Sequence, residues 1–429
     1  MLERGPGLRG SLAMLRRELT PTRVALGLTA FLFAATGPLV ILLTTANSAH
    51  LPFETTVSWI FIVYFSGGIS TLLLSLYYRQ PVMVAWSIPG AAIVADALAR
   101  YPFSDVLGAY LVLGLIVVVM GLSGLVRWVM RWLPVPVLLG MVAAVLLPYG
   151  QAVFSALVDV PVVALPTLAI YLFLAAFPHL GRRCPPIVGA IIVMLALSTL
   201  TGSTHWGALQ PGVATPKFFW PSFNLATIIE LVPPLGVAVL AIQNGQGTAV
   251  LLSQGYEPPI NSMTFASGLA CLLNSFFGGH QACVAGPTIA IAGGSEGGPR
   301  EGRFSATFVA GVCWVGLSII APVAASIDKV VLRKSLIPML GGLAMLNVLV
   351  GTLMAAFAGP FRNGALFAFL ITLSDIKVAG IGSAFWGLLG GMLAAIVLDN
   401  TDFRKLRQEI RAERLARLTL IEEAEAEVH

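Results

Sequence analysis

The sequence predicts an all-α protein that crosses a membrane many times. Hydrophobic residues make up 57% of the chain and charged residues only 10%, whereas a soluble domain carries about 25% charged residues. The mean hydropathy is +0.89. Apolar stretches of about 20 residues recur along the chain, which is the length that a helix needs to cross about 30 Å of hydrocarbon. A membrane β-barrel would instead show short alternating segments.

Fourteen apolar segments can be placed, and the third and the tenth are short and broken by Pro and Gly. They cover residues 24–46, 57–78, 81–98, 105–126, 134–150, 161–178, 184–201, 225–252, 260–276, 281–294, 304–325, 335–356, 363–375 and 379–398. Short, interrupted segments at matching places in two halves of a membrane protein indicate a transporter's binding site.

The distribution of Lys and Arg predicts that both termini are cytoplasmic. Residues 1–23 carry five Arg and lack the apolar core and cleavage site of a signal peptide, so they form a cytoplasmic N-terminal segment. With the N-terminus inside, 19 of the 25 Lys and Arg lie on the cytoplasmic side. The exception is the loop with Lys329, Arg333 and Lys334. Residues 399–429 form a charged cytoplasmic tail, read as a solvated helix or as one that lies on the membrane surface.

A weak internal repeat divides the chain into two halves of seven segments. Pro89-Gly90 and Gly286-Pro287 are offset by about 198 positions, and residues 135–140 resemble residues 337–342 at an offset of 202. Because an odd number of segments reverses the direction of insertion, the two halves must be inverted repeats, an arrangement used for alternating access.

Each broken segment reads as part strand and part half-helix. Residues 82–86 are β-branched or apolar, Ser87 can cap a helix, Ile88 and Pro89 suit its first turn, and residues 91–98 continue it. Irregular backbone inside a bilayer is tolerated only where protein or a watery cavity satisfies it. Two such strands can pair, and each half-helix then points its positive N-terminal end at the membrane midplane, where an anion would bind.

The residues around these breaks resemble those of the benzoate:proton symporter family. The similarity is carried by residues 74–92 (LSLYYRQPVMVAWSIPGAA), 243–251 (QNGQGTAVL) and 255–259 (GYEPP). It implies the uracil-permease and sulfate-permease fold, in many members a homodimer. The implied core domain comprises residues 24–127 and 225–325, and the implied gate domain comprises residues 128–201 and 335–398.

The tenth segment departs from that family. Where the family usually reads Gly-Gly-x-x-x-Asn-Leu-Ala-Ala-Ile, residues 278–289 read GGHQACVAGPTI. The resemblance therefore places a different set of side chains against the substrate here. The implied binding residues of the two broken segments are Trp86, Ser87, Ile88, Pro89, Gly90, Ala91, Gln281, Ala282, Cys283 and Val284.

Three amides in the eighth segment favour an acidic substrate. Related nucleobase permeases place a carboxylate where this chain has Gln243, Asn244 and Gln246, and an amide can donate to a carboxylate without repelling it. The alternative is that these amides only hold helices together. Phe33 and Trp86 are candidate clamps for an aromatic ring, with ordinary packing as the alternative.

Moving a monoanion inward against 100 mV costs about 2.3 kcal/mol, and a co-transported proton cancels its charge. His280 is the most attractive proton carrier, because an unperturbed imidazole titrates near pH 6.5 and this one directly precedes the tenth segment. The alternative is a structural His. Asp96 is the other candidate, because carboxylates within membrane segments are costly, but Arg100 at i+4 would make a structural pair with it. Glu230, at the start of the eighth segment, is expected to lie at the helix N-terminus or at an interface, in a solvated role rather than as a proton carrier.

These observations predict a secondary active transporter in the inner membrane that couples protons to uptake of benzoate or a related small, aromatic carboxylate. The alternatives are an anion exchanger or a nucleobase or other small-anion permease of the same fold. Gly121-Leu-Ser-Gly124 has the form of an intramembrane serine protease site, but small-residue packing explains it better. Four unpaired cysteines indicate neither disulfide nor metal site. We expect no enzymatic activity, no cofactor and no nucleic-acid partner.

Overall fold

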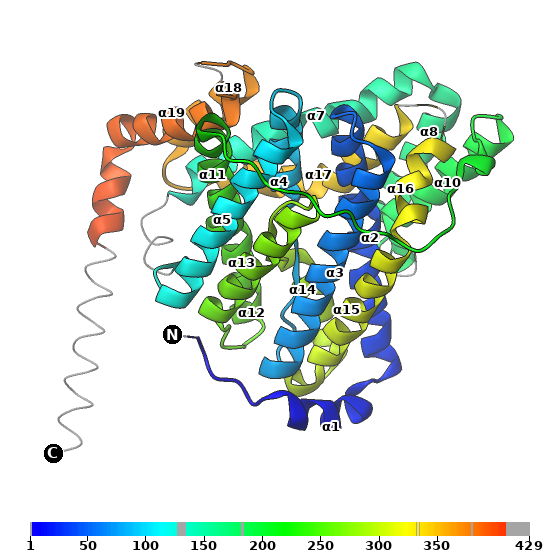
Figure 1. The fold of residues 1–429 in the computed structure, drawn as a ribbon, viewed down its shortest axis with the longest axis horizontal. Helices are drawn as coiled ribbons and strands as arrows, with labels where there is room; N and C mark the ends of the chain where they lie inside the picture. The colour runs from blue at the N-terminus through cyan, green and yellow to red at the C-terminus, as the bar shows by residue number, and fades with distance from the viewer. Residues whose placement is uncertain are drawn as a thin grey trace.

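The computed structural model describes residues 2–126, 134–181, 184–331, 333, 335–378 and 381–408. The helices form one bundle, with α1 running across one end of it and α4, α11 and α18 reaching the other end (Figure 1). The predicted tail beyond residue 408 and Arg127, Arg131, Arg182 and Arg183 lie outside the described residues.

The elements of the first half are as follows: α1 (Leu8–Glu18), α2 (Pro21–Ser48), α3 (Phe53–Tyr78), β1 (Val84–Trp86), α4 (Ile88–Leu98), α5 (Phe103–Ser123), α7 (Val135–Asp159), α8 (Pro161–Ala176), α9 (Pro178–Gly181) and α10 (Pro186–Leu200).

The elements of the second half are a 3-10 turn (Trp206–Ala208), α11 (Leu225–Val237), a π-helix (Ala238–Asn244), α12 (Gly245–Ser253), α13 (Ile260–Phe276), β2 (Ala282–Val284), α14 (Gly286–Ala292), two 3-10 turns (Ser295–Gly297 and Arg300–Gly302), α15 (Phe304–Ile319), α16 (Ala321–Val330), α17 (Leu336–Phe357), α18 (Arg362–Leu373) and α19 (Ser383–Leu398).

Among the described residues, seven helices are long and apolar enough to cross a membrane, or eight if the bent pair Ser383–Leu398 and Asn400–Gln408 counts as one. Four other apolar helices have between 10 and 17 residues, including α8, α10 and α18. They are shorter than the roughly 20 residues of a straight crossing. Length and composition therefore support a multi-pass membrane protein without fixing the number of crossings.

The two broken segments meet as a short antiparallel strand pair in the interior. Val84 lies opposite Val284, Ala85 opposite Cys283, and Trp86 opposite Ala282. Two further backbone bonds extend the pairing, from the Ala285 N–H to the Met83 carbonyl (3.0 Å) and from the Ser87 N–H to the Gln281 carbonyl (2.8 Å). All six strand residues are buried.

Side chains from neighbouring helices satisfy the outer edges of this strand pair. The Thr71 hydroxyl of α3 bonds to both the N–H and the carbonyl of Val84, at 3.0 and 3.1 Å. On the other strand, the Asn244 Oδ1 accepts from the Val284 N–H (2.8 Å) and the Cys271 Sγ accepts from the Ala282 N–H (3.2 Å). Buried backbone groups need such partners because no water reaches them.

The register of the strand pair agrees with the internal repeat, in which corresponding residues of the two halves are 198 positions apart. Ala85 and Cys283 are 198 positions apart and face each other. The same offset carries the Val84–Val284 pair onto the Ala282–Trp86 pair and Pro89 onto Pro287. This register is the one that the predicted inverted repeat requires for the two broken segments.

Corresponding helices of the two halves make corresponding contacts. α5 packs on α13, and its counterpart in the other half, α15, packs on α3. Likewise α2 packs on α15 and α11 on α5, while α7 packs against α17. The helix pair α8 and α10 corresponds to the pair α18 and α19. The pattern is that of two related halves interleaved around the strand pair.

The N-terminal segment caps a helix that lies far along the chain. Pro259, the residue before α13, has no side chain that can cap it. The Glu3 carboxylate accepts from the N–H groups of Asn261 and Ser262, both at 2.9 Å, and from the Ser262 hydroxyl at 2.8 Å. A carboxylate at a helix N-terminus satisfies free N–H groups and complements the helix dipole.

Glu3 is expected to give this cap a pH dependence. Burial by itself raises the pKa of the Glu3 carboxyl, but the hydrogen bonds from Asn261 and Ser262 outweigh burial and hold that pKa below its ordinary value of 4.5. Because the folded pKa is depressed, the stabilisation is present above the unfolded pKa and is lost as pH falls through the folded pKa.

We therefore expect Glu3→Ala to lower the thermal unfolding midpoint in detergent at pH 7, since losing a helix cap costs about 1 kcal/mol. The deficit should shrink as the pH falls below about 4. Glu257→Ala is the matched control, because Glu257 is exposed in the loop just before α13. An equal loss in both variants, or a deficit independent of pH, would contradict the capping role.

Candidate functional site

The candidate site surrounds the point where β1 runs into α4. Ser87 caps α4, since its hydroxyl accepts from the Gly90 N–H at 3.0 Å. Pro89, Gly90 and Ala91 are buried in the first turn. A Cβ added at Gly90 would lie 2.8 Å from the Ser87 side chain and 3.0 Å from the Gln281 Oε1, so the site leaves no room for a larger residue.

The predicted amides come to this place from a π-helix. The π-helix Ala238–Asn244 interrupts the long helix after Pro233 and Pro234 and carries Gln243 and Asn244. Such segments occur often at functional sites. Asn244 is buried and holds β2 through its Oδ1, as described above. Gln246 lies next to Gly286, where an added Cβ would come within 2.8 Å of its Cγ.

Several buried amide atoms have no hydrogen-bond partner among the described residues. Gln281 is fully buried, and both its Nε2 and its Oε1 are unpartnered. The Asn244 Nδ2 and the Gln243 Oε1 are unpartnered as well. An unsatisfied buried polar atom costs about 1 to 3 kcal/mol, so a group of them beside the end of a half-helix points to a bound ligand or water.

His280 is fully buried, and both of its ring nitrogens are engaged. The Trp59 indole N–H donates to the His280 Nδ1 at 2.8 Å, and the Nε2 lies 3.0 Å from the Ser87 carbonyl. Since Nδ1 accepts, Nε2 carries the proton and donates to Ser87. His280 thereby ties α3 and the tenth segment to the start of α4, which fits the structural alternative for this residue.

The two predicted aromatic clamps lie in different surroundings. The Trp86 ring packs against Tyr64, with centroids 4.1 Å apart, and against Trp314 at 5.9 Å. The Trp86 ring thus lies between α3 and α15, in the hydrophobic cluster that also contains residues of both strands. Phe33 is half-buried on α2. Packing explains Trp86 as placed, although its indole N–H is one more unpartnered buried group.

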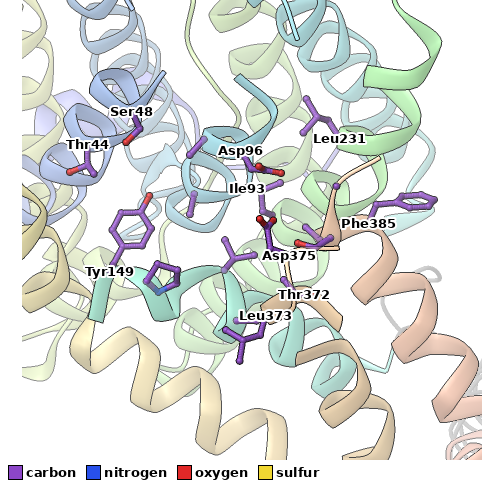
Figure 2. A pocket seen from close by; sticks show the side chains of 18 of the residues that line it. Thr44, Ser48, Ile93, Asp96, Tyr149, Leu231, Thr372, Leu373, Asp375 and Phe385 are labelled. Atoms are coloured by element: carbon purple, nitrogen blue, oxygen red, sulfur yellow. The ribbon is translucent and has the colours of Figure 1, made fainter. Parts of the chain in front are cut away.

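A cavity of about 370 Å³ lies at the end of the bundle where α2 and α4 finish (Figure 2). Its wall combines residues of α2, α4 and α11 with residues of α7, α17, the α18 end and the α19 start. Among the lining residues are Thr44, Ser48, Ala92, Ile93, Asp96, Tyr149, Glu230, Leu231, Thr372, Asp375, Ser383 and Phe385. Of the predicted site residues, only Asp96 lines it.

A cluster of charges borders this cavity and joins its two walls. The Arg100 guanidinium bonds to Asp96 at 2.8 Å and forms an ion pair with Glu230, which also accepts from the Tyr101 hydroxyl at 2.8 Å. Lys377, from the loop after α18, pairs with Asp96 at 3.6 Å. The predicted Asp96–Arg100 pair is present. The expectation that Glu230 is solvated is wrong, because Glu230 is 5% exposed.

The backbone of the loop before α19 closes on the same cluster. A Cβ at Gly382 would come within 3.0 Å of three charged side chains, at 2.6 Å from Arg100, 2.8 Å from Glu230 and 2.9 Å from Asp96. The sequence does not predict this contact or the place of Tyr149 in the cavity wall, because neither carries a local motif.

Ser123 of the protease-like motif is the last residue of α5 and is exposed. Its hydroxyl donates to the Met120 carbonyl and accepts from the Leu125 N–H.

The structure thus gathers most of the predicted residues around the antiparallel strand pair. Trp86, Ser87, Ile88, Pro89, Gly90 and Ala91 lie on one broken segment, and His280, Gln281, Ala282, Cys283 and Val284 on the other. Asn244 and Gln246 adjoin the second segment, and Gln243 precedes Asn244 on the π-helix. Asp96 is set apart, two turns along α4 at the cavity. Thr71 and Cys271, which hold the strands, were missed because they resemble ordinary helix residues.

Comparison with solved structures identifies the fold. The transmembrane domain of a cyanobacterium bicarbonate transporter, BicA, superposes with a TM-score of 0.59 at 16% identity, covering 87% of this chain and 97% of that chain. The overall structure of SLC26A9 gives a TM-score of 0.60 at 14% identity, covering 91% of this chain and 67% of that chain. At these identities the likeness concerns the fold.

Two relatives match the chain along almost their whole length. The inner membrane protein YdcO of Escherichia coli (strain K12) is 31% identical over 381 residues, which cover 85% of this chain and 95% of that protein. A benzoate membrane transport protein of Acinetobacter baylyi is 28% identical over 389 residues, covering 90% and 98%. Both names describe membrane proteins rather than enzymes.

The model of one protein family matches most of the sequence. It is described as benzoate membrane transport protein and covers residues 17–397. With the fold, the apolar helices and the relatives, this match establishes a multi-pass inner-membrane transporter for small anions. The chain therefore belongs to the benzoate membrane transport protein family.

Proposed function

We propose that this protein takes up benzoate or a related small aromatic carboxylate together with protons, by alternating access. The observation that carries the substrate class is the set of unpartnered amide atoms on Gln243, Asn244 and Gln281, of which Gln281 lies at the start of α4 and Asn244 holds β2. The Asn244 and Gln281 amide nitrogens can donate to a carboxylate. The α4 dipole favours a negative charge at the same place. The relative named for benzoate supports the aromatic acid.

The proposed motion is that of a core domain against a gate domain. Both strands and α2 to α5, with α11 to α15, make up the proposed core, and α7 to α10 with α17 to α19 make up the proposed gate. The cavity between α4 and α7 follows this boundary. We further propose fourteen membrane segments as an inverted 7+7 repeat, cytoplasmic termini and a homodimer.

Asp96 is our proposed proton carrier in preference to His280. Asp96 lines the cavity, so protons and solvent can reach it. Its partner Arg100 is shared with Glu230, so a proton on Asp96 would leave Arg100 paired. His280 could accept a proton only by giving up the hydrogen bond from Trp59.

Thermal stabilisation of the detergent-purified protein tests the substrate class. The panel contains benzoate, substituted benzoates, aliphatic carboxylates, sulfate, uracil and xanthine, at pH 5.5 and 7.5. We expect stabilisation by aromatic acids, stronger at the lower pH. A response to nucleobases or sulfate alone would contradict the proposed substrate while leaving the fold unaffected.

Gln281→Leu should separate ligand binding from helix packing. Because the Gln281 amide has no partner in the described part of the chain, its loss should leave the unfolding midpoint unchanged or higher, while the benzoate Kd rises about tenfold through the lost hydrogen bonds. Asn244→Leu is the contrast, since it leaves the buried Val284 N–H without an acceptor and should lower the unfolding midpoint. A destabilised Gln281→Leu with unchanged affinity would assign Gln281 to packing.

Asp96→Asn should uncouple transport from protons. Asparagine cannot take up a proton, so uptake driven by a pH gradient into proteoliposomes should be lost while substrate exchange across the membrane continues. His280→Gln is the comparison and should weaken both activities together through loss of structure. If His280→Gln alone abolishes proton-driven uptake while exchange persists, His280 is the carrier.

A further inference from the structure

The helix α1 is fixed to the end of the bundle by contacts at both of its ends. At its start, the Gly7 N–H donates to the Tyr77 carbonyl at 3.1 Å, and the Arg79 Nε donates to the Ser11 hydroxyl at 2.9 Å. At its end, Glu18 forms an ion pair with Arg23, and the Ser305 hydroxyl donates to the Glu18 carbonyl at 2.8 Å. These anchors belong to α2, α3 and α15.

One face of α1 is buried against the rest of the bundle, and this face contains both an apolar and a polar residue. Leu15 is 8% exposed and packs with Leu76 and Phe304. Ser11 is fully buried. The helix therefore holds a fixed orientation around its own axis, so the remaining faces can be assigned to the surroundings.

A leucine stripe on α1 is left without cover. Leu8 is 40% exposed and Leu12 is 52% exposed, and Leu19 at the end of the helix is 37% exposed. At about 100° per residue, Leu8 and Leu12 lie within about 40° of each other and continue the buried Leu15. The exposed stripe is thus the outward extension of the docked apolar face.

Two arginines of α1 lie next to this stripe, since Arg9 and Arg16 are about 60° and about 40° from Leu12 around the helix, and Arg17 lies on the far side. Arg9, Arg16 and Arg17 are all exposed. The two carboxylates of the same segment are already engaged, Glu3 at the start of α13 and Glu18 with Arg23. The exposed part of α1 therefore presents leucines and positive charge together.

The position of α1 places this surface at the edge of the bilayer. Two residues separate α1 from α2, a helix of 28 residues that is long and apolar enough to cross the membrane. α1 runs across the end of the bundle rather than along it (Figure 1). An apolar stripe beside a basic face, at this depth, is the arrangement of a helix that lies in the interface plane.

We propose that α1 is an interfacial helix that binds anionic lipid headgroups and anchors the α2, α3 and α15 side of the bundle to one leaflet. The leucines insert among the acyl chains at the boundary, and Arg9, Arg16 and Arg17 contact the phosphates. A negatively charged surface attracts such clusters of arginine within a Debye length. The proposal concerns the membrane and does not depend on which anion is transported.

The lipid preference can be measured on the full-length protein in nanodiscs of phosphatidylcholine, with and without phosphatidylglycerol. We expect phosphatidylglycerol to raise the unfolding midpoint and added salt to reduce the rise. The variant Arg9→Gln/Arg16→Gln/Arg17→Gln should lose most of the rise. Its matched control removes three cations from another described helix, Arg404→Gln/Lys405→Gln/Arg407→Gln, and should keep it. An equal rise in all three proteins, or an equal loss in both variants, would overturn the proposal.

The depth of the helix provides a second test. A nitroxide is attached at Leu12→Cys or Ala13→Cys, in a background where the two partly exposed cysteines, Cys184 and Cys313, are replaced by Ser. Position 12 should be accessible to oxygen and shielded from a water-soluble nickel chelate, and the exposed position 13 should show the opposite. Access of the nickel chelate to both positions would overturn insertion of the leucine stripe.

Discussion

The structure depends on the pairing of two three-residue strands in the interior of a hydrophobic bundle. Each broken segment exposes backbone groups at a depth where water cannot satisfy them. The strands satisfy each other, and Thr71, Cys271 and Asn244 satisfy the outer edges. Because the partners come from both halves of the chain, the pairing also fixes how the halves interleave.

The same requirement explains why the candidate site is where it is. Near the satisfied strand backbone, both amide atoms of Gln281, the Asn244 Nδ2 and the Trp86 indole N–H are left without a partner among the described residues. His280 does not belong to that set, because Trp59 and Ser87 occupy its two nitrogens. A buried polar atom without a partner costs stability, and a ligand with acceptor oxygens would satisfy the two unpartnered donors, the Asn244 Nδ2 and the Gln281 Nε2.

The charged cluster at the cavity is held by ion pairs, whereas the strand pair is held by backbone hydrogen bonds. Arg100 holds two carboxylates, Asp96 on α4 and Glu230 on α11, and Lys377 and Gly382 approach from the opposite wall of the cavity. The Arg100–Glu230 pair is mostly buried and is costly to separate once formed, whereas the Asp96 and Lys377 side chains are 41% and 43% exposed. The buried pair therefore ties the end of α4 to α11, and the backbone of Gly382 packs against it.

The sequence by itself determined the membrane class, the two broken segments and the cap at Ser87, because composition, Pro-Gly breaks and capping are properties of neighbouring residues. The offset of 198 likewise agrees with the register of the strands. Only the tertiary structure decided that Trp86 packs on Tyr64, that Glu230 is buried and that Glu3 caps α13. Each of those outcomes depends on a partner distant in sequence, and no local pattern encodes which distant group will satisfy a buried charge, ring or N–H.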